Sequence, residues 1–174
     1  LAARRPRRSL TLFVRWHSEA KSVEEVRLCM LDASNTALLE EIAPGVFDHP
    51  IDPRWRDEFV QDPRHHLALA IVGSQVIGMA SGVHYVHPDK APEMWINEVG
   101  VATTHRGAGL GHRLVEKLLI RARELGCHEA WVLTDQGNRT AMRMYAKAGG
   151  LEEPVPSTMF TFRLPVHRPD KASD

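Results

Sequence analysis

The stretch that decides the fold is Val99–Arg113, with the sequence VGVATTHRGAGLGHR. It begins at the end of an apolar, β-prone run, passes through glycines at positions 107, 109 and 111, and enters an amphipathic helical pattern. The first amides of a helix have no partner within the helix, and the helix dipole favours an anion beside them. Glycines let the backbone approach a phosphate closely because they carry no Cβ atom. The sequence therefore predicts a pyrophosphate-binding turn between a strand and a helix.

Two other phosphate-binding motifs do not fit this turn. A P-loop needs Gly-Lys-Ser/Thr, but Gly111 is followed by His112 and Arg113. The dinucleotide motif G-x-G-x-x-G fails because His112 stands where its third glycine belongs. The pattern present is Arg-x-x-Gly-x-Gly, formed by Arg106, Gly109 and Gly111, and both Arg106 and Arg113 supply charge-assisted donors for phosphate oxygens.

Outward from the turn, strand and helix patterns alternate along the chain. The order is β-α-α-β-β-β-α-β-α-β, which predicts an α/β protein with a mixed sheet and helices on both faces. A Pro-Gly pair, a Gly-Ser pair and a Gly-Gly pair mark breaks between elements. The predicted strands are 26–31, 67–72, 75–86, 94–101, 129–134 and 159–164, and the predicted helices are 34–42, 53–62, 109–125 and 138–148.

Length and composition indicate an ordinary globular protein. A chain of 174 residues is expected to form one domain, and the periodic patterns place it at residues 26–164. Residues 1–25 are interpreted as a basic leader or disordered arm, with targeting or nucleic-acid binding by this arm as the less favoured alternatives, and residues 165–174 as a flexible tail. Two cysteines without a CxxC pair favour a reducing, cytoplasmic location. No run approaches the roughly 18 apolar residues of a membrane span, and neither a membrane nor a nucleic-acid partner is expected.

Two linked motifs resemble the GNAT acetyltransferase superfamily. The segment Arg106–Gly111, RGAGLG, is similar to the family's acetyl-CoA pyrophosphate loop. Asn138, Ala141, Tyr145 and Gly149, spaced as N-x-x-A-x-x-x-Y-x-x-x-G, are similar to its second motif on the helix after the next strand. The resemblance implies a splayed sheet with acetyl-CoA wedged between the strands predicted at 94–101 and 129–134.

The resemblance also implies which residues contact acetyl-CoA. Its pantetheine arm would pair with the strand backbone at Val99, Gly100 and Val101, where a mid-strand glycine fits a bulge or a close ligand approach. Asn138 would both cap its helix and reach the same arm. The expected cofactor-binding residues are Val99, Gly100, Val101, Arg106, Gly107, Ala108, Gly109, Leu110, Gly111, His112, Asn138 and Tyr145.

Acetyl transfer to an amine needs a base and an acid. An amine with a pKa of about 10 is mostly protonated at neutral pH, so it must lose a proton before it attacks a thioester. Glu98 is the candidate base because strand alternation puts it on the same face as Gly100, with Glu93 and Asp135 as alternatives. Tyr145 is the candidate acid because its motif position resembles the family's tyrosine beside the CoA sulfur. The alternative for Glu98 is a structural or substrate-binding carboxylate, and the alternative for Tyr145 is a half-buried tyrosine that only packs its helix.

Charge favours a small cationic acceptor. Residues 28–105, which build the acceptor pocket in this family, hold four Lys/Arg and eleven Asp/Glu, whereas residues 106–174 hold eleven Lys/Arg and eight Asp/Glu. A cationic substrate would be drawn to the first region and the anionic cosubstrate to the second. No metal site is expected, because His84 and His87 would point to opposite faces of a strand. The candidate substrate-binding residues are Asp48, Asp52, His84, Glu93, Glu98 and Asp135.

A narrower resemblance indicates a substrate class. The segments 45–48, 84–90 and 95–101 are similar to those of gentamicin-type aminoglycoside 3-N-acetyltransferases. This similarity implies an antibiotic-resistance enzyme that acetylates the 3-amino group of an aminoglycoside by direct attack in a ternary complex. The alternatives are acetylation of a protein, peptide or polyamine, and a non-catalytic CoA-binding module. The resemblance is compatible with a homodimer, and the sequence contains no pattern that identifies an interface.

Overall fold

The computed structural model describes residues 25–153 and 159–164. It contains one five-stranded sheet in the order β1-β2-β3-β4-β5, antiparallel throughout except for the parallel β4–β5 pair. The strands are β1 (Arg27–Met30), β2 (His65–Val72), β3 (Gln75–Tyr85), β4 (Glu93–Val101) and β5 (Glu129–Trp131). The helices are η1 (Thr36–Glu40), α1 (Pro53–Gln61), η2 (Thr103–His105), α2 (Leu110–Glu124) and α3 (Arg139–Lys147). The mixed α/β architecture predicted from the sequence is confirmed.

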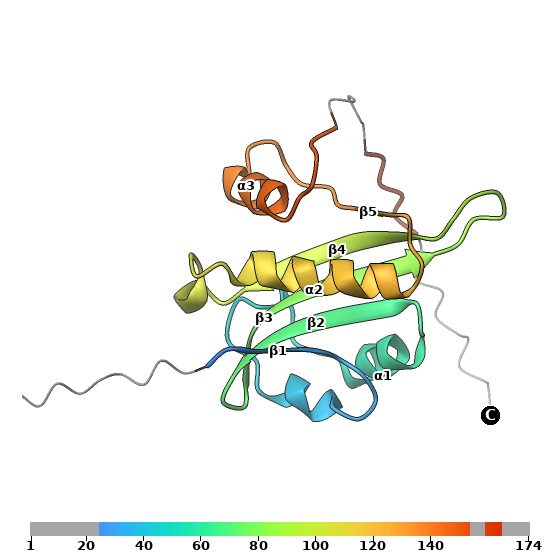
Figure 1. Ribbon diagram of the computed structural model, residues 1–174. Coiled ribbons are helices and arrows are strands. Elements are labelled where there is room, and N and C mark those ends of the chain that lie inside the picture. The colour runs from blue at the N-terminus through green and yellow to red at the C-terminus, as the bar shows by residue number, and fades with distance from the viewer. Residues whose placement is uncertain (1–24, 154–158, 165–174) are drawn as a thin grey trace, which may run out of the picture.

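The two faces of the sheet are covered differently. Helix α2 lies across one face, where it contacts β2, β3 and β4 (Figure 1). A Cβ atom on Gly78 would lie 3.1 Å from Leu114 Cδ1, so the even-numbered residues of β3 from Gly78 onward point toward α2. We call this side the α2 face. The opposite side is the α1 face, because Phe59 of α1 packs edge-on against His65 of β2 there.

Small residues allow α2 to pack closely on the sheet. Ala68 pairs with Ala80 and Ala70 with Gly78, so the side chains at the centre of the α2 face are small and leave room for the helix. Leu114 and Leu118 of α2 fill the space above it and are 0% exposed. Burying a leucine side chain contributes about 2 kcal/mol, so these contacts fix the helix that begins at the glycine turn.

The N-terminal helix predicted at 34–42 is shorter than expected. The structure forms a single 3-10 segment, η1, because the Asn35 side chain accepts from the Asp32 amide and donates to the Met30 carbonyl instead of capping a helix. Ile42 then forms a parallel β-bridge with Val76, which draws the chain back to the sheet.

The prediction of a strand at 159–164 is wrong. These residues adopt no strand, and Met159, Phe160, Phe162 and Leu164 are 79–83% exposed. The apolar alternation is suitable for a strand, but a strand also needs an edge with which to pair. The predicted strand 129–134 shrinks to the three residues of β5, and this short edge leaves little backbone for pairing. The arm at 1–24 and the tail at 165–174 lie outside the described residues.

None of the described helices is both long enough and apolar enough to cross a membrane.

A histidine pair, of which His66 is buried, lies on the α2 face of the sheet. His66 Nε2 and His84 Nδ1 share a hydrogen bond of 2.8 Å, and His66 is 5% exposed. Burial lowers the pKa of His66 to about 4, and the nearby His84, Arg121 and His65 act in the same direction. The native state therefore holds His66 neutral at a pH where the unfolded chain binds a proton.

This pair predicts an acid-sensitive fold. The unfolded chain binds more protons between pH 6.5 and pH 4, so the free energy of unfolding should fall by about 2 kcal/mol from pH 7 to pH 5. Urea titrations at several pH values measure this slope. His66→Gln should flatten it, whereas the exposed control His128→Gln should retain it. Equal slopes in all three proteins would show that His66 does not carry the acid sensitivity.

Candidate functional site

The glycine turn after β4 is open and conformationally demanding. Gly107 and Gly109 have φ values of +82° and +76°, a backbone region that side chains other than glycine rarely adopt. A Cβ atom on either residue would meet nothing within 4 Å, so the turn is unobstructed. Gly109 is the N-cap of α2 and offers no side chain to its amides. The glycines thus shape the turn and leave its amides accessible.

The turn presents a row of free donors. Within the described part of the chain, the amides of Gly107 through His112 have no hydrogen-bond acceptor, and the first bond of α2 runs from the Arg113 amide to the Gly109 carbonyl at 3.2 Å. Arg106 is exposed, and its Nε donates to the Val101 carbonyl at 3.0 Å, which ties the turn to the end of β4. Free amides, the helix dipole and a neighbouring guanidinium together suit a phosphate group.

Strands β4 and β5 part beside this turn. Their pairing covers only Glu93–Trp95 of β4 and ends at the Trp95–Trp131 pair. From Ile96 to Val101, the described chain places no strand against the β5 side of β4. Alternate amides and carbonyls of this stretch therefore face a gap, where an extended ligand can pair with them as a strand would.

Helix α3 lies close to α2 and to this part of β4. Asn138 caps it, because its Oδ1 accepts from the Ala141 amide at 3.1 Å. A Cβ atom on Gly111 would lie 3.7 Å from Met144 Cγ and 3.8 Å from Val99 Cγ1, so α2, α3 and β4 meet at this point. Tyr145 follows Met144 and is half-buried, and burial raises the pKa of its phenol. Its hydroxyl is therefore neutral, and able to donate a proton, across the physiological pH range.

His112 also links the two helices. Its ring contacts Glu116 in α2 through Nδ1 at 3.2 Å and the Lys147 carbonyl of α3 through Nε2 at 3.3 Å. Its side chain therefore joins α2 to the end of α3, and its backbone amide remains part of the turn.

A β-bulge aims Glu98 at the α1 face. Ser81 pairs with Glu98 and Gly82 with Ile96, so Asn97 is the extra residue. Glu98 and Gly100 both lie opposite odd-numbered residues of β3, which confirms that they share a face. Burial raises the pKa of Glu98, the negative charge of Asp48 raises it further, and His49 acts in the opposite direction. The loop carrying Asp48 and His49 therefore lies beside Glu98.

Gly100 is where this loop meets the sheet. A Cβ atom there would lie 2.0 Å from the Val46 carbonyl oxygen, closer than any real contact. A bulge or a close ligand approach was expected at Gly100, but the bulge lies at Asn97. The close approach is made by the chain itself, and it holds Asp48 near Glu98.

The other predicted substrate residues are not all brought together. Glu93 lies on the α1 face, where it accepts from Tyr85 Oη at 2.7 Å. His84 is not brought to that face, because it points toward α2 and bonds to His66. Asp52 caps α1 and pairs with Arg54, whose hydrogen bonds lower the pKa of Asp52 to about 2.

Asp135 serves the entry to α3. Its Oδ1 accepts from the Gly137 amide at 2.5 Å, and its carbonyl accepts from the Asn138 amide at 2.9 Å. Its carboxylate therefore orders the turn between β5 and the Asn138 cap.

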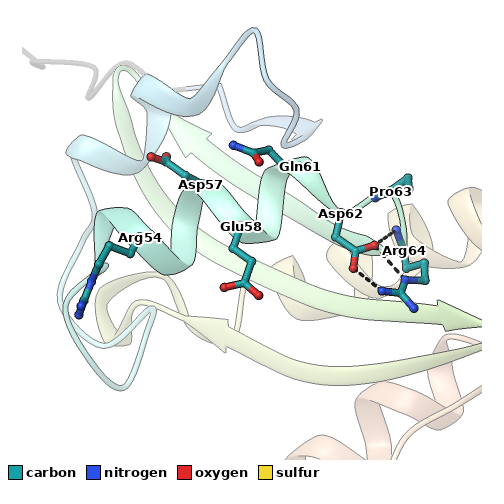
Figure 2. A pocket seen from close by; sticks show the side chains of 7 residues that line it. All are labelled: Arg54, Asp57, Glu58, Gln61, Asp62, Pro63 and Arg64. Atoms are coloured by element: carbon teal, nitrogen blue, oxygen red, sulfur yellow. Dashed lines mark hydrogen bonds and ion pairs between the residues drawn. The ribbon is translucent and has the colours of Figure 1, made fainter. Parts of the chain in front are cut away.

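An open groove of about 710 Å³ runs along α1 (Figure 2). Its two arginines are engaged, since Arg54 pairs with Asp52 and Arg64 with Asp62. None of its lining residues belongs to the glycine turn or to the Glu98 loop. The groove is therefore separate from the glycine turn and from the parting of β4 and β5.

Two tryptophans on the α1 face are candidate binding residues that the sequence pattern did not reveal. Trp95 and Trp131 are cross-strand partners, with ring centroids 5.7 Å apart and an interplanar angle of 15°. Only the parallel register of β4 and β5 brings them together. Strict alternation along the strand would also place Trp95 and Glu98 on opposite faces of the sheet. The bulge at Asn97 brings them to the same face, and no feature of the local sequence predicts this bulge.

The fold has many solved counterparts. The aminoglycoside acetyltransferase meta-AAC0020 from an uncultured soil metagenomic sample matches with a TM-score of 0.67 at 16% identity, over 79% of this chain and 97% of its own. AAC(6')-Iy, solved with the bisubstrate analog CoA-S-monomethyl-acetylneamine, matches with a TM-score of 0.66 at 16% identity, over 80% and 99%. The ribosomal-protein-alanine N-acetyltransferase of Brucella melitensis biovar Abortus 2308 reaches 0.61 at 16% identity, over 79% and 100%.

Identities this low show a shared fold and leave the acceptor open. No curated protein sequence matches the chain significantly. The sequence model of the acetyltransferase (GNAT) family, however, matches residues 33–150, well over half of the chain. The matched region contains the glycine turn, the parted strands and the capped α3 helix. The protein is therefore a member of the GNAT acetyltransferase family.

Proposed function

We propose that the protein transfers the acetyl group of acetyl-CoA to the 3-amino group of an aminoglycoside and thereby confers resistance to the antibiotic. The observation that carries the proposal is the pair of acids, Glu98 and Asp48, at the point where β4 leaves β5. A polycationic amine bound there is attracted to both carboxylates and lies next to the strand edge that would carry the thioester. Two solved enzymes of similar fold are aminoglycoside acetyltransferases.

The glycine turn suits the cosubstrate. The free amides of Gly107 through His112 would hold the pyrophosphate, and the unpaired edge of β4 at Val99–Val101 would pair with the pantetheine arm. When bound, acetyl-CoA supplies an activated acetyl thioester. A backbone amide of this strand edge would stabilise the oxyanion formed when the amine attacks.

Two side chains would handle the protons. Glu98 takes a proton from the acceptor ammonium, directly or through a water, and its raised pKa brings it closer to the working pH. The C–N bond then forms and the C–S bond breaks. Tyr145 gives its phenolic proton to the departing sulfur and regains one from solvent. Amine and thioester held together remove most of the entropic barrier, so no covalent enzyme intermediate is needed.

A thiol-release assay with acetyl-CoA tests the acceptor class. The panel contains gentamicin, kanamycin, spermidine and a lysine peptide. We expect saturable turnover with an aminoglycoside, and the mass and NMR spectrum of the product should place the acetyl group on the 3-amino nitrogen. Turnover with spermidine or the peptide alone would contradict the aminoglycoside proposal, and binding of acetyl-CoA without any turnover would contradict catalysis. The cytoplasmic location and the homodimer stay predictions.

Glu98→Gln tests the base. We expect kcat/KM to fall about tenfold at neutral pH, because water can still accept the proton with lower efficiency. In the wild type, activity should rise as pH increases through the raised pKa of Glu98, since only the carboxylate accepts a proton. The variant should lack this rising limb. Glu58→Gln, the same change at an exposed position of α1, should retain it. A limb that persists in Glu98→Gln would place the base elsewhere.

A further inference from the structure

We propose that the stacked indoles of Trp95 and Trp131 form a second acceptor subsite, which takes a sugar ring distant from the amine that is acetylated. The proposal rests on the aminoglycoside function above and deepens it. It assigns the protein a multi-ring aminosugar as acceptor, in preference to a single ring or a linear polyamine.

Trp95 is exposed, and its stacking partner Trp131 is held firmly in place. Trp95 is 37% exposed, although it is a large apolar side chain. Trp131 Nε1 donates to Tyr85 Oη at 2.6 Å, and Tyr85 Oη donates to Glu93 Oε2 at 2.7 Å. Lys90 pairs with the same carboxylate. This chain of contacts fixes the plane of Trp131, and stacking fixes the plane of Trp95. The platform is therefore rigid before any ligand arrives, which reduces the entropy lost on binding.

Trp95 lies on the same face of the sheet as Glu98 and Glu93. Glu98, Trp95 and Glu93 pair with Ser81, Val83 and Tyr85, which alternate along β3 and so point to the same side. The bulge at Asn97 makes this possible, because without the extra residue Trp95 and Glu98 would lie on opposite faces.

The spacing fits an acceptor of several rings. Glu98 and Trp95 stand opposite Ser81 and Val83, which are two residues apart on β3, and this corresponds to roughly 7 Å. An amine delivered to Glu98 would leave the next linked ring of an aminosugar over Trp95. The C–H face of a sugar packs on an indole, and its ammonium groups gain a cation–π contribution. A linear polyamine has no ring to cover this surface.

Trp95→Leu, which keeps an apolar side chain, tests the subsite. The acceptors are kanamycin, which has three rings, and 2-deoxystreptamine, a single ring that carries the same 3-amino group. We expect KM for kanamycin to rise about tenfold with kcat nearly unchanged, because the loss of one cation–π contact of about 1.4 kcal/mol is a factor of ten. The kinetic constants for 2-deoxystreptamine should not change. Trp95→Phe, which retains an aromatic face, should raise KM less.

Trp55→Leu is the matched control, because Trp55 lies on α1 and is 65% exposed. It should leave both acceptors unaffected. An unchanged KM for kanamycin in Trp95→Leu, or an equal rise for both acceptors, would overturn the subsite while the proposed function stands. No turnover of any aminoglycoside by the wild type would overturn the proposed function and the subsite with it. A purely structural role for Trp95 would lower the melting temperature without separating the two acceptors.

Discussion

Gly100→Ala is expected to destabilise the protein by at least about 3 kcal/mol, which corresponds to a fall in Tm of roughly 10 °C for a chain of this size. The new Cβ atom would lie 2.0 Å from the Val46 carbonyl oxygen and 3.1 Å from the Val46 carbonyl carbon. Backbone atoms cannot rotate away as a flexible side chain can. Either β4 or the loop before Asp48 must move, and both hold the site together.

Gly111→Ala is the matched control for this substitution. Its Cβ atom would meet Met144 and Val99 at 3.7 Å and 3.8 Å, which are ordinary packing distances. Alanine also favours a helix over glycine by roughly 1 kcal/mol, so its Tm should stay constant or rise. Thermal unfolding of the three purified proteins measures both effects. A Gly100→Ala protein that melts with the wild type would show that the loop does not press on β4.

The glycine turn could be predicted because its information is local. Gly107 and Gly109 adopt left-handed backbone conformations, and the helical pattern that follows them identifies the start of α2 without knowledge of the rest of the fold. The Asn138 cap is local in the same way, since its Oδ1 accepts from the amide of Ala141, only three residues further along the chain. Signals of this kind survive whatever the tertiary structure does to the chain.

The α1 face could not be predicted because its information lies in strand pairing. The bulge at Asn97 depends on which residue of β3 stands opposite, and no property of Asn97 reveals it. His84 was expected near the substrate, but its partner, His66, lies on another strand. The residues 159–164 carry the pattern of a strand without an edge to receive them. In each case, a second segment decides the outcome.

Tyr145→Phe is expected to lower kcat by about 100-fold, because general-acid catalysis contributes about 100-fold or more. The phenol is the group proposed to protonate the departing sulfur, and burial raises its pKa, so it stays protonated at the pH of the assay. Phenylalanine keeps the packing beside Met144 and removes only the hydroxyl. The dissociation constant for acetyl-CoA should therefore change by less than about twofold, and kcat alone should respond.

Thr140→Val provides the control, since it removes a hydroxyl from an exposed position of the same helix, α3, and should leave kcat and the dissociation constant unchanged. Rapid-mixing measurements of thiol release separate the chemical step from product release in each protein. If Tyr145→Phe releases thiol at the wild-type rate, solvent protonates the sulfur and Tyr145 is a packing residue. If both kcat and acetyl-CoA binding collapse together, the hydroxyl holds the cosubstrate instead. Only a loss confined to kcat assigns the proton to Tyr145.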